Sequence, residues 1–113
     1  MTDKRWKATE RAVAERLGGK RIPITGRQRG ATADATSRGN WLSPEIKDRA
    51  KLPNWLMEAL SQAIAAVRGD QIPIVILHEK GQFHDNDLVL VRLHDWCDLV
   101  GNLRVSSETT EGF

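Results

Sequence analysis

Two short runs of apolar residues set the strongest limit on how this 113-residue chain can fold. Residues 72–77 and 88–93 are almost entirely β-branched residues and leucine, which is typical of strands covered on both faces. A polar segment that contains glycine, 81–86, separates them, so we expect a β-hairpin. Neither run approaches the roughly 20 apolar residues that span a bilayer, and the sequence therefore predicts no membrane segment.

Helical patterns surround this hairpin. We expect one helix from a cap at Thr2 or Asp3 to about Leu17, where two glycines stop it. A second helix follows Pro53, and a short third helix passes through 96–100. The chain is long enough for one domain with a real core. We therefore expect a single domain over 1–104 and a polar tail over 105–113.

Three short strands are expected between the first two helices, at 21–25, 34–36 and 41–47. Along the last of them apolar and polar residues alternate, as on a strand with one covered face. The predicted element order is then α-β-β-β-α-β-β-α. This order indicates an α/β fold with a central mixed five-stranded sheet flanked by helices.

The net charge of +2 hides an uneven distribution. Residues 1–51 contain 13 Lys/Arg and 6 Asp/Glu (+7), whereas 52–113 contain 4 and 9 (−5), and the two parts sum to +2. A basic half of this kind suggests a polyanionic partner. The single cysteine, Cys97, cannot form an intramolecular disulfide, and no signal peptide is recognised, so we expect a cytoplasmic protein.

An acidic residue lies within the apolar stripe of the first expected helix. At about 100° per residue, Glu10 falls between Ala14 and Leu17 on the face that carries Trp6. Because an unpaired buried charge costs several kcal/mol, this carboxylate needs a partner or a metal. Two simpler alternatives stay open: Glu10 pairs with a buried arginine, or the apolar stripe ends there.

A second unusual group of charges lies on the strand expected at 41–47. Glu45 and Lys47 lie two residues apart and project from its polar face. A solvated edge strand would also explain them, and Pro44 favours an edge because it lacks an N–H. Asp34, 11 positions before Glu45, lies in the preceding short strand, so pairing would bring two carboxylates together. Such carboxylates repel each other unless a divalent cation lies between them, and oxygen ligands favour Mg²⁺ or Mn²⁺.

An acid followed by Glu-x-Lys on an apolar-backed strand resembles the PD-(D/E)XK nuclease superfamily. Within it, the chain is most similar to the archaeal-type Holliday junction resolvases and their phage-encoded relatives, over residues 6–100. Two positions depart from the pattern: Ala33 stands where proline is common, and Pro44 lies inside the expected active-site strand. The resemblance rests on Thr9-Glu10-Arg11, the basic strand at 20–24, the Gly/Arg-rich loop at 26–29, Ala33-Asp34 and Pro44-Glu45-Ile46-Lys47.

The resemblance implies a restriction-endonuclease-like core and an endodeoxyribonuclease that depends on Mg²⁺, for which Mn²⁺ can substitute. Asp34, Glu45 and the backbone carbonyl of Ile46 would be metal ligands. Lys47 would orient the attacking water, and Glu10 would hold a metal-bound water or a second cation. We expect Glu10, Asp34, Glu45 and Lys47 to be the catalytic residues. Four-way DNA junctions would be the substrate and a homodimer the active form, in the nucleoid or the cytoplasm of a phage-infected cell.

The basic residues around this site would bind the DNA backbone, an interaction that is independent of sequence and weakens with salt. A merely soluble basic surface is the alternative. The expected DNA-binding residues are Lys7, Arg11, Arg21, Arg27, Arg29, Arg38, Arg49 and Lys51.

Expectations also follow for the three histidines, for two tryptophans and for alternative functions. The spacing of His78, His84 and His94 matches no familiar zinc ligand set, so we expect them to have turn and strand-end roles. Trp41 and Trp55 could stack on bases, pack a dimer interface or belong to a core. The other functions that stay open are a nuclease of nicking, restriction or repair specificity and a non-catalytic DNA-binding module.

Overall fold

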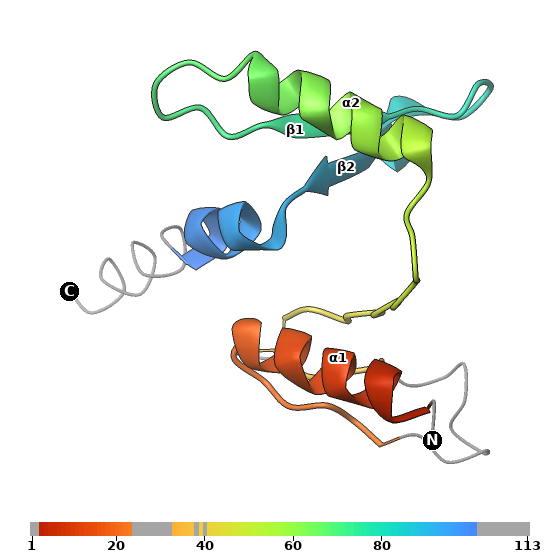
Figure 1. Ribbon diagram of the computed structural model, residues 1–113, viewed down its shortest axis with the longest axis vertical. Helices are drawn as coiled ribbons and strands as arrows, with labels where there is room; N and C mark the ends of the chain where they lie inside the picture. Colours follow the sequence, from red (N-terminus) through yellow and green to blue (C-terminus); the bar gives the residue numbers. More distant parts are fainter. Residues whose placement is uncertain (1–2, 24–32, 38, 40, 102–113) are drawn as a thin grey trace. The chain divides into compact units, whose positions relative to one another are not determined.

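The computed structural model describes residues 3–23, 33–37, 39 and 41–101. The chain forms α1 (Asp3–Arg16), α2 (Asn54–Ala65), β1 (Ile74–Leu77), the 3-10 helix η2 (His84–Asn86) and β2 (Leu88–Val91), followed by a helix over 93–101 (Figure 1). No helix in these ranges is long and apolar enough to cross a membrane. The chain divides into two compact units, 1–50 and 51–113. The expected domain boundary at 104 stays a prediction, and the expected tail lies outside the described residues.

The first helix ends as predicted, at a pair of glycines. Gly18 adopts a φ of 77°, a conformation that a residue without a Cβ takes at no steric cost. Its N–H donates to the Glu15 carbonyl at 3.0 Å, and the N–H of Gly19 donates to the Ala14 carbonyl at 2.9 Å. These two bonds form a Schellman motif, which satisfies the last carbonyls of α1 and turns the chain away.

After α1, three extended segments of unit 1 lie side by side. The N–H of Ile22 donates to the Asp34 carbonyl at 2.9 Å, and the N–H of Thr36 donates to the Lys20 carbonyl at 2.8 Å. Between them, Arg21 and Ala35 form an isolated antiparallel bridge. The N–H of Asp34 then donates to the Pro44 carbonyl at 3.0 Å. The segment around Asp34 therefore lies between the other two.

These segments do not make the predicted sheet. The expected restriction-endonuclease-like core with a five-stranded mixed sheet is wrong, because the part of the chain that the structure describes contains only the two-stranded sheet of β1 and β2. Pro23 and Pro44 have no N–H to donate to a ladder. The N–H of Ile46 donates to the Asp34 side chain instead of a backbone carbonyl. Pairing thus stops after one bridge.

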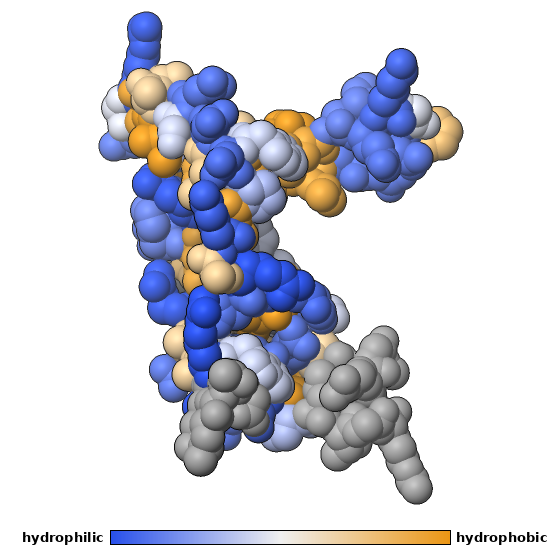
Figure 2. Space-filling view, turned by 45° about the vertical axis from the view of Figure 1, so that its right-hand side comes forward, coloured by the Kyte–Doolittle hydropathy of each residue, from blue (hydrophilic) through white to orange (hydrophobic). Residues whose placement is uncertain are grey.

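In unit 2 the predicted hairpin is confirmed. β1 and β2 are antiparallel, with Ile74 opposite Val91 and Leu77 opposite Leu88, and α2 packs against β1 (Figure 1). The expectation that both faces of these strands are covered is wrong: Ile76 is 53% exposed and Val89 is 60% exposed. The only buried residue between 51 and 101 is Pro73. Figure 2 accordingly shows hydrophobic side chains at the surface beside hydrophilic ones.

The second of the two glycines that follow α1 allows a test of packing in unit 1. A Cβ on Gly19 would lie 2.1 Å from the backbone oxygen of Thr36, so Gly19→Ala must push two backbone segments apart. We expect it to lower the free energy of unfolding in urea by about 1–3 kcal/mol, the usual cost of overpacking. Gly101→Ala is the control, because its Cβ would meet nothing within 4 Å. Equal stability of the two variants would show that Gly19 does not pack against Thr36.

Candidate functional site

Asp34 is, with Glu10, one of the two buried acidic residues in the described part of unit 1. It is only 7% exposed, and its Oδ2 accepts the N–H of Ile46 at 2.6 Å. Its own N–H and carbonyl are bonded to Pro44 and Ile22. Backbone and side chain thus both bind Asp34 to its neighbours, and the hydrogen bond from Ile46 engages one of its two carboxylate oxygens. The predicted proximity of Asp34 to the Glu-x-Lys segment is confirmed.

The segment from 41 to 48 alternates along its length, as predicted. Its odd-numbered residues are exposed and its even-numbered residues are half-buried. Glu45 and Lys47 lie on the exposed side, where the Lys47 Nζ is 2.9 Å from the Glu45 Oε1 and both side chains are about 60% exposed. The prediction that Glu45 and Lys47 share a face is therefore confirmed.

Ile46 offers a backbone oxygen beside this pair. In an extended segment the N–H and C=O of one residue point to the same edge. Because the N–H of Ile46 donates to Asp34, we expect its carbonyl on the edge that faces Asp34. A carboxylate and a carbonyl on one edge are oxygen donors of the kind that Mg²⁺ binds.

Glu10 has a different environment from the one expected of a metal ligand. It is 7% exposed, and its Oε1 lies 2.6 Å from the Nε of Arg21, whose side chain is also largely buried. The Arg21 guanidinium carbon in turn lies 5.3 Å from the centroid of the Trp6 ring, a cation–π distance. The alternative in which Glu10 pairs with a buried arginine is thus the observed one. The catalytic role of Glu10 stays a prediction.

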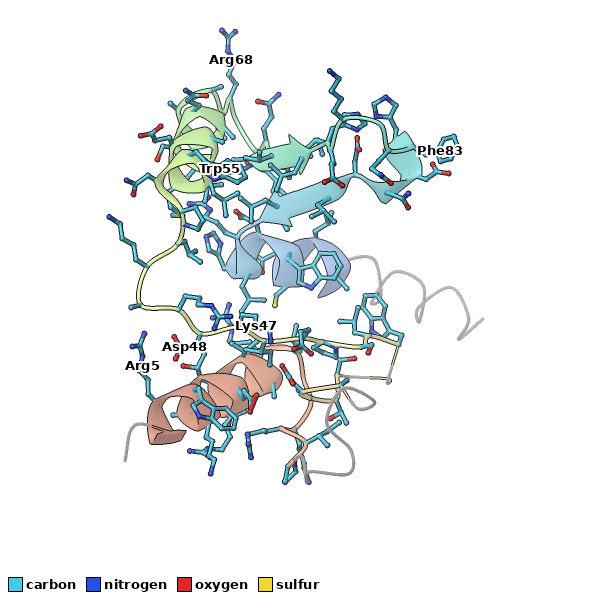
Figure 3. All side chains as sticks on the ribbon, turned by 90° about the vertical axis from the view of Figure 1, so that its right-hand side faces the viewer. Arg5, Lys47, Asp48, Trp55, Arg68 and Phe83 are labelled. Atoms are coloured by element: carbon cyan, nitrogen blue, oxygen red, sulfur yellow. The ribbon has the colours of Figure 1, made fainter. Side chains whose placement is uncertain are left out.

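Sequence reasoning missed Asp48. Its Oδ1 accepts from the Arg5 Nη2 at 3.0 Å and its Oδ2 from the Thr9 hydroxyl at 2.9 Å, and Figure 3 shows Arg5 and Asp48 side by side. These bonds attach α1 to the segment that carries Glu45 and Lys47. The sequence did contain a signal for Asp48. It follows Leu42, Pro44 and Ile46 on the half-buried side of the alternating segment, where a carboxylate needs a partner just as Glu10 does.

The predicted ligands do not gather as a set. Over the described ranges, the one group of three acidic, histidine or cysteine side chains with ligand atoms within 4.8 Å of one another is His78, His84 and Asp87. Glu10, Asp34 and Glu45 form no such group. The Glu10 carboxylate forms an ion pair with Arg21, whereas Asp34 and Glu45 lie on neighbouring segments.

The expected DNA-binding residues have unequal environments. Arg11 and Arg49 are exposed in unit 1 and Lys51 is exposed in unit 2, whereas Arg21 is paired with Glu10. The Lys7 Nζ lies 5.6 Å from the Trp6 ring centroid. Arg27, Arg29 and Arg38 lie outside the described residues. A cavity of about 310 Å³ in unit 1 is lined by Arg11, Glu15, Gly19, Lys20, Arg21 and Pro23.

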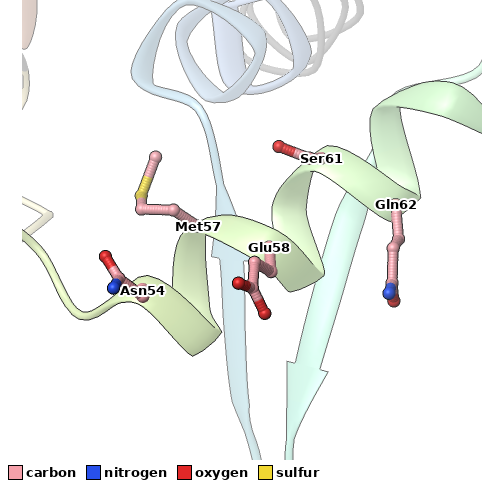
Figure 4. Close-up of a pocket in the computed structure, with 5 residues that line it drawn as sticks. All are labelled: Asn54, Met57, Glu58, Ser61 and Gln62. Carbon is pink, nitrogen blue, oxygen red and sulfur yellow. The ribbon is translucent and has the colours of Figure 1, made fainter.

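Unit 2 has a pocket of its own along α2. Its volume is about 410 Å³, and its lining side chains project from one helix (Figure 4). Only one of them, Glu58, is charged, so the pocket offers no pair of carboxylates for a metal. The lining residues are Asn54, Met57, Glu58, Ser61 and Gln62.

Comparisons with known proteins add no relative: no family model, no curated protein and no solved structure matches the chain.

The Glu10–Arg21 ion pair can be tested by a double-mutant cycle. Glu10→Gln should destabilise the protein by roughly 3 kcal/mol, because it leaves the largely buried guanidinium without its counter-charge. Added to Arg21→Gln, the same change should cost much less, with a coupling of roughly 1–3 kcal/mol in urea unfolding. Additive effects, with a coupling close to zero, would contradict the pairing.

Proposed function

We propose that this protein is a metal-dependent, structure-selective DNA endonuclease. The observation that carries the proposal is the hydrogen bonding of buried Asp34 to the segment with Glu45 and Lys47. Two carboxylates and a lysine on neighbouring extended segments are the combination on which the resemblance to PD-(D/E)XK nucleases rests. The reaction would be hydrolysis of a phosphodiester bond by water, without a covalent intermediate.

The donor atoms at this site are of the kind that a hard divalent cation prefers. Asp34, Glu45 and the carbonyl of Ile46 would hold Mg²⁺, or Mn²⁺ in its place, because these cations prefer oxygen ligands. When bound, the cation polarises a phosphate oxygen and lowers the pKa of an attacking water. The exposed Lys47 ammonium would orient that water and stabilise the negative charge that builds on the phosphate.

The substrate would be branched DNA in recombination or repair, and four-way junctions in particular. The +7 charge of residues 1–51 favours binding to phosphates, and the exposed side chains of Arg11 and Arg49 belong to the unit that holds Asp34. Resolving a junction requires two nicks in opposed strands. A two-fold homodimer would supply two sites for them.

A non-catalytic DNA-binding module is the second candidate. It is favoured by the pairing of Glu10 with Arg21 at 2.6 Å, which uses one of the four expected catalytic groups for a structural contact. Under this alternative the basic residues bind DNA in the same way. The two candidates differ only in whether DNA is cut.

Two substitutions test the catalytic proposal. Asp34→Asn keeps an oxygen that can accept the Ile46 N–H, and Glu45→Gln changes an exposed side chain, so both variants should fold. We expect each to reduce Mg²⁺-dependent cleavage of a four-way junction by a factor of about 100 or more, because each loses a metal-binding charge, with junction binding largely kept. Glu58→Gln, an exposed acid on α2, is the control. Cleavage by either variant at near wild-type rate would refute this site.

Specificity is tested separately with a panel of substrates. The wild-type protein should cut a four-way junction faster than linear duplex or flap DNA of the same sequence, because paired sites in a dimer match paired nicks. Faster cutting of the linear duplex or the flap would instead identify a nuclease of nicking, restriction or repair specificity.

A further inference from the structure

The hairpin of unit 2 brings two histidines and an aspartate together at its turn. β1 and β2 pair with Leu77 opposite Leu88, so the next residues, His78 and Asp87, come to face each other. The His78 Nδ1 lies 2.5 Å from the Asp87 Oδ1. η2 returns the chain so that the His84 Nδ1 lies 3.1 Å from the Asp87 Oδ2. Two imidazoles thus converge on one carboxylate.

We propose that His78, His84 and Asp87 bind a divalent transition-metal cation, with Zn²⁺ as the best fit. Their ligand atoms all lie within 4.8 Å of one another. A tetrahedral zinc ion with bonds of about 2.0–2.2 Å needs ligand atoms roughly 3.3 Å apart, so small side-chain rotations suffice to bind it. Two nitrogens and one carboxylate oxygen select Zn²⁺ over Mg²⁺ or Ca²⁺, which prefer oxygen alone.

The exposure of the three side chains suits an ion that enters from solvent. Asp87 is only 15% exposed and is held by both histidines. His84 is 83% exposed, so it can turn onto an arriving ion without disturbing packed residues. Three protein ligands leave a fourth zinc position for water.

The turn itself is long and exposed, and local backbone hydrogen bonds order it, such as the bond from the Asp87 N–H to the His84 carbonyl at 2.9 Å. Hairpin loops usually have about 2–5 residues, whereas this connection runs from 78 to 87, and its residues from 78 to 86 are all exposed. Phe83, near its tip, is 84% exposed (Figure 3). A cation bound by His78, His84 and Asp87 would join both ends of the turn to its middle. Small units with limited cores are often stabilised by such a metal.

Zinc binding to the intact chain tests this site directly. The protein is freed of metal with a chelator, and ZnCl₂ is titrated in by isothermal calorimetry near neutral pH. We expect one ion per chain, with affinity falling by roughly tenfold or more in His84→Ala and in Asp87→Asn, each of which removes a ligand. His94→Ala is the matched control, because His94 is exposed and contacts Asp95, outside the cluster.

Each outcome decides the proposal. Loss of affinity in His84→Ala and Asp87→Asn but not in His94→Ala, with unchanged circular dichroism, would establish the site. Absence of zinc binding by the wild-type chain, or equal affinity in all variants, would overturn it and leave a purely hydrogen-bonded triad. Neither result bears on the proposed nuclease residues, which all lie in unit 1 and are tested by DNA cleavage.

Discussion

The hydrogen bonds of one buried residue, Asp34, hold the extended part of unit 1 together. Its carbonyl accepts from Ile22, its N–H donates to Pro44, and its carboxylate accepts from Ile46. A buried carboxylate is costly unless its oxygens are bonded, so the position of Asp34 and the path of both neighbouring segments depend on each other. The same bonds bring this carboxylate next to the segment that carries Glu45 and Lys47.

Acidic side chains also attach α1 to this arrangement. Glu10 binds Arg21 on the first extended segment, and Asp48 binds Arg5 and Thr9 at the end of the third. The Glu10 ion pair and the Asp48 hydrogen bonds therefore help to position the segments around Asp34. Glu45, by contrast, is exposed and lies 2.9 Å from the Lys47 Nζ, so its carboxylate is open to an ion that arrives from solvent.

Local patterns in the sequence predicted most of the elements but not the sheet. The two glycines after α1, the helical pattern after Pro53 and the apolar runs of the hairpin act through residues close in sequence, and the helix end, the second helix and the hairpin that they predict are confirmed. The five-stranded sheet required long-range pairing, which Pro23, Pro44 and the Ile46–Asp34 bond limit. The same difference between short-range and long-range contacts applies to the site. The shared face of Glu45 and Lys47 follows from the alternation of neighbouring residues, whereas the partners of Glu10 and Asp48 lie on other segments and could not be predicted in this way.

The dependence of junction cleavage on added metal tests the central claim most directly. With the intact protein and a labelled four-way junction, Mg²⁺ or Mn²⁺ should produce nicks in two opposed strands that a chelator abolishes, since the proposed hydrolysis would require a cation held by Asp34 and Glu45. A junction that is bound but stays uncut at every concentration of both metals would contradict a nuclease and favour a protein that only binds DNA.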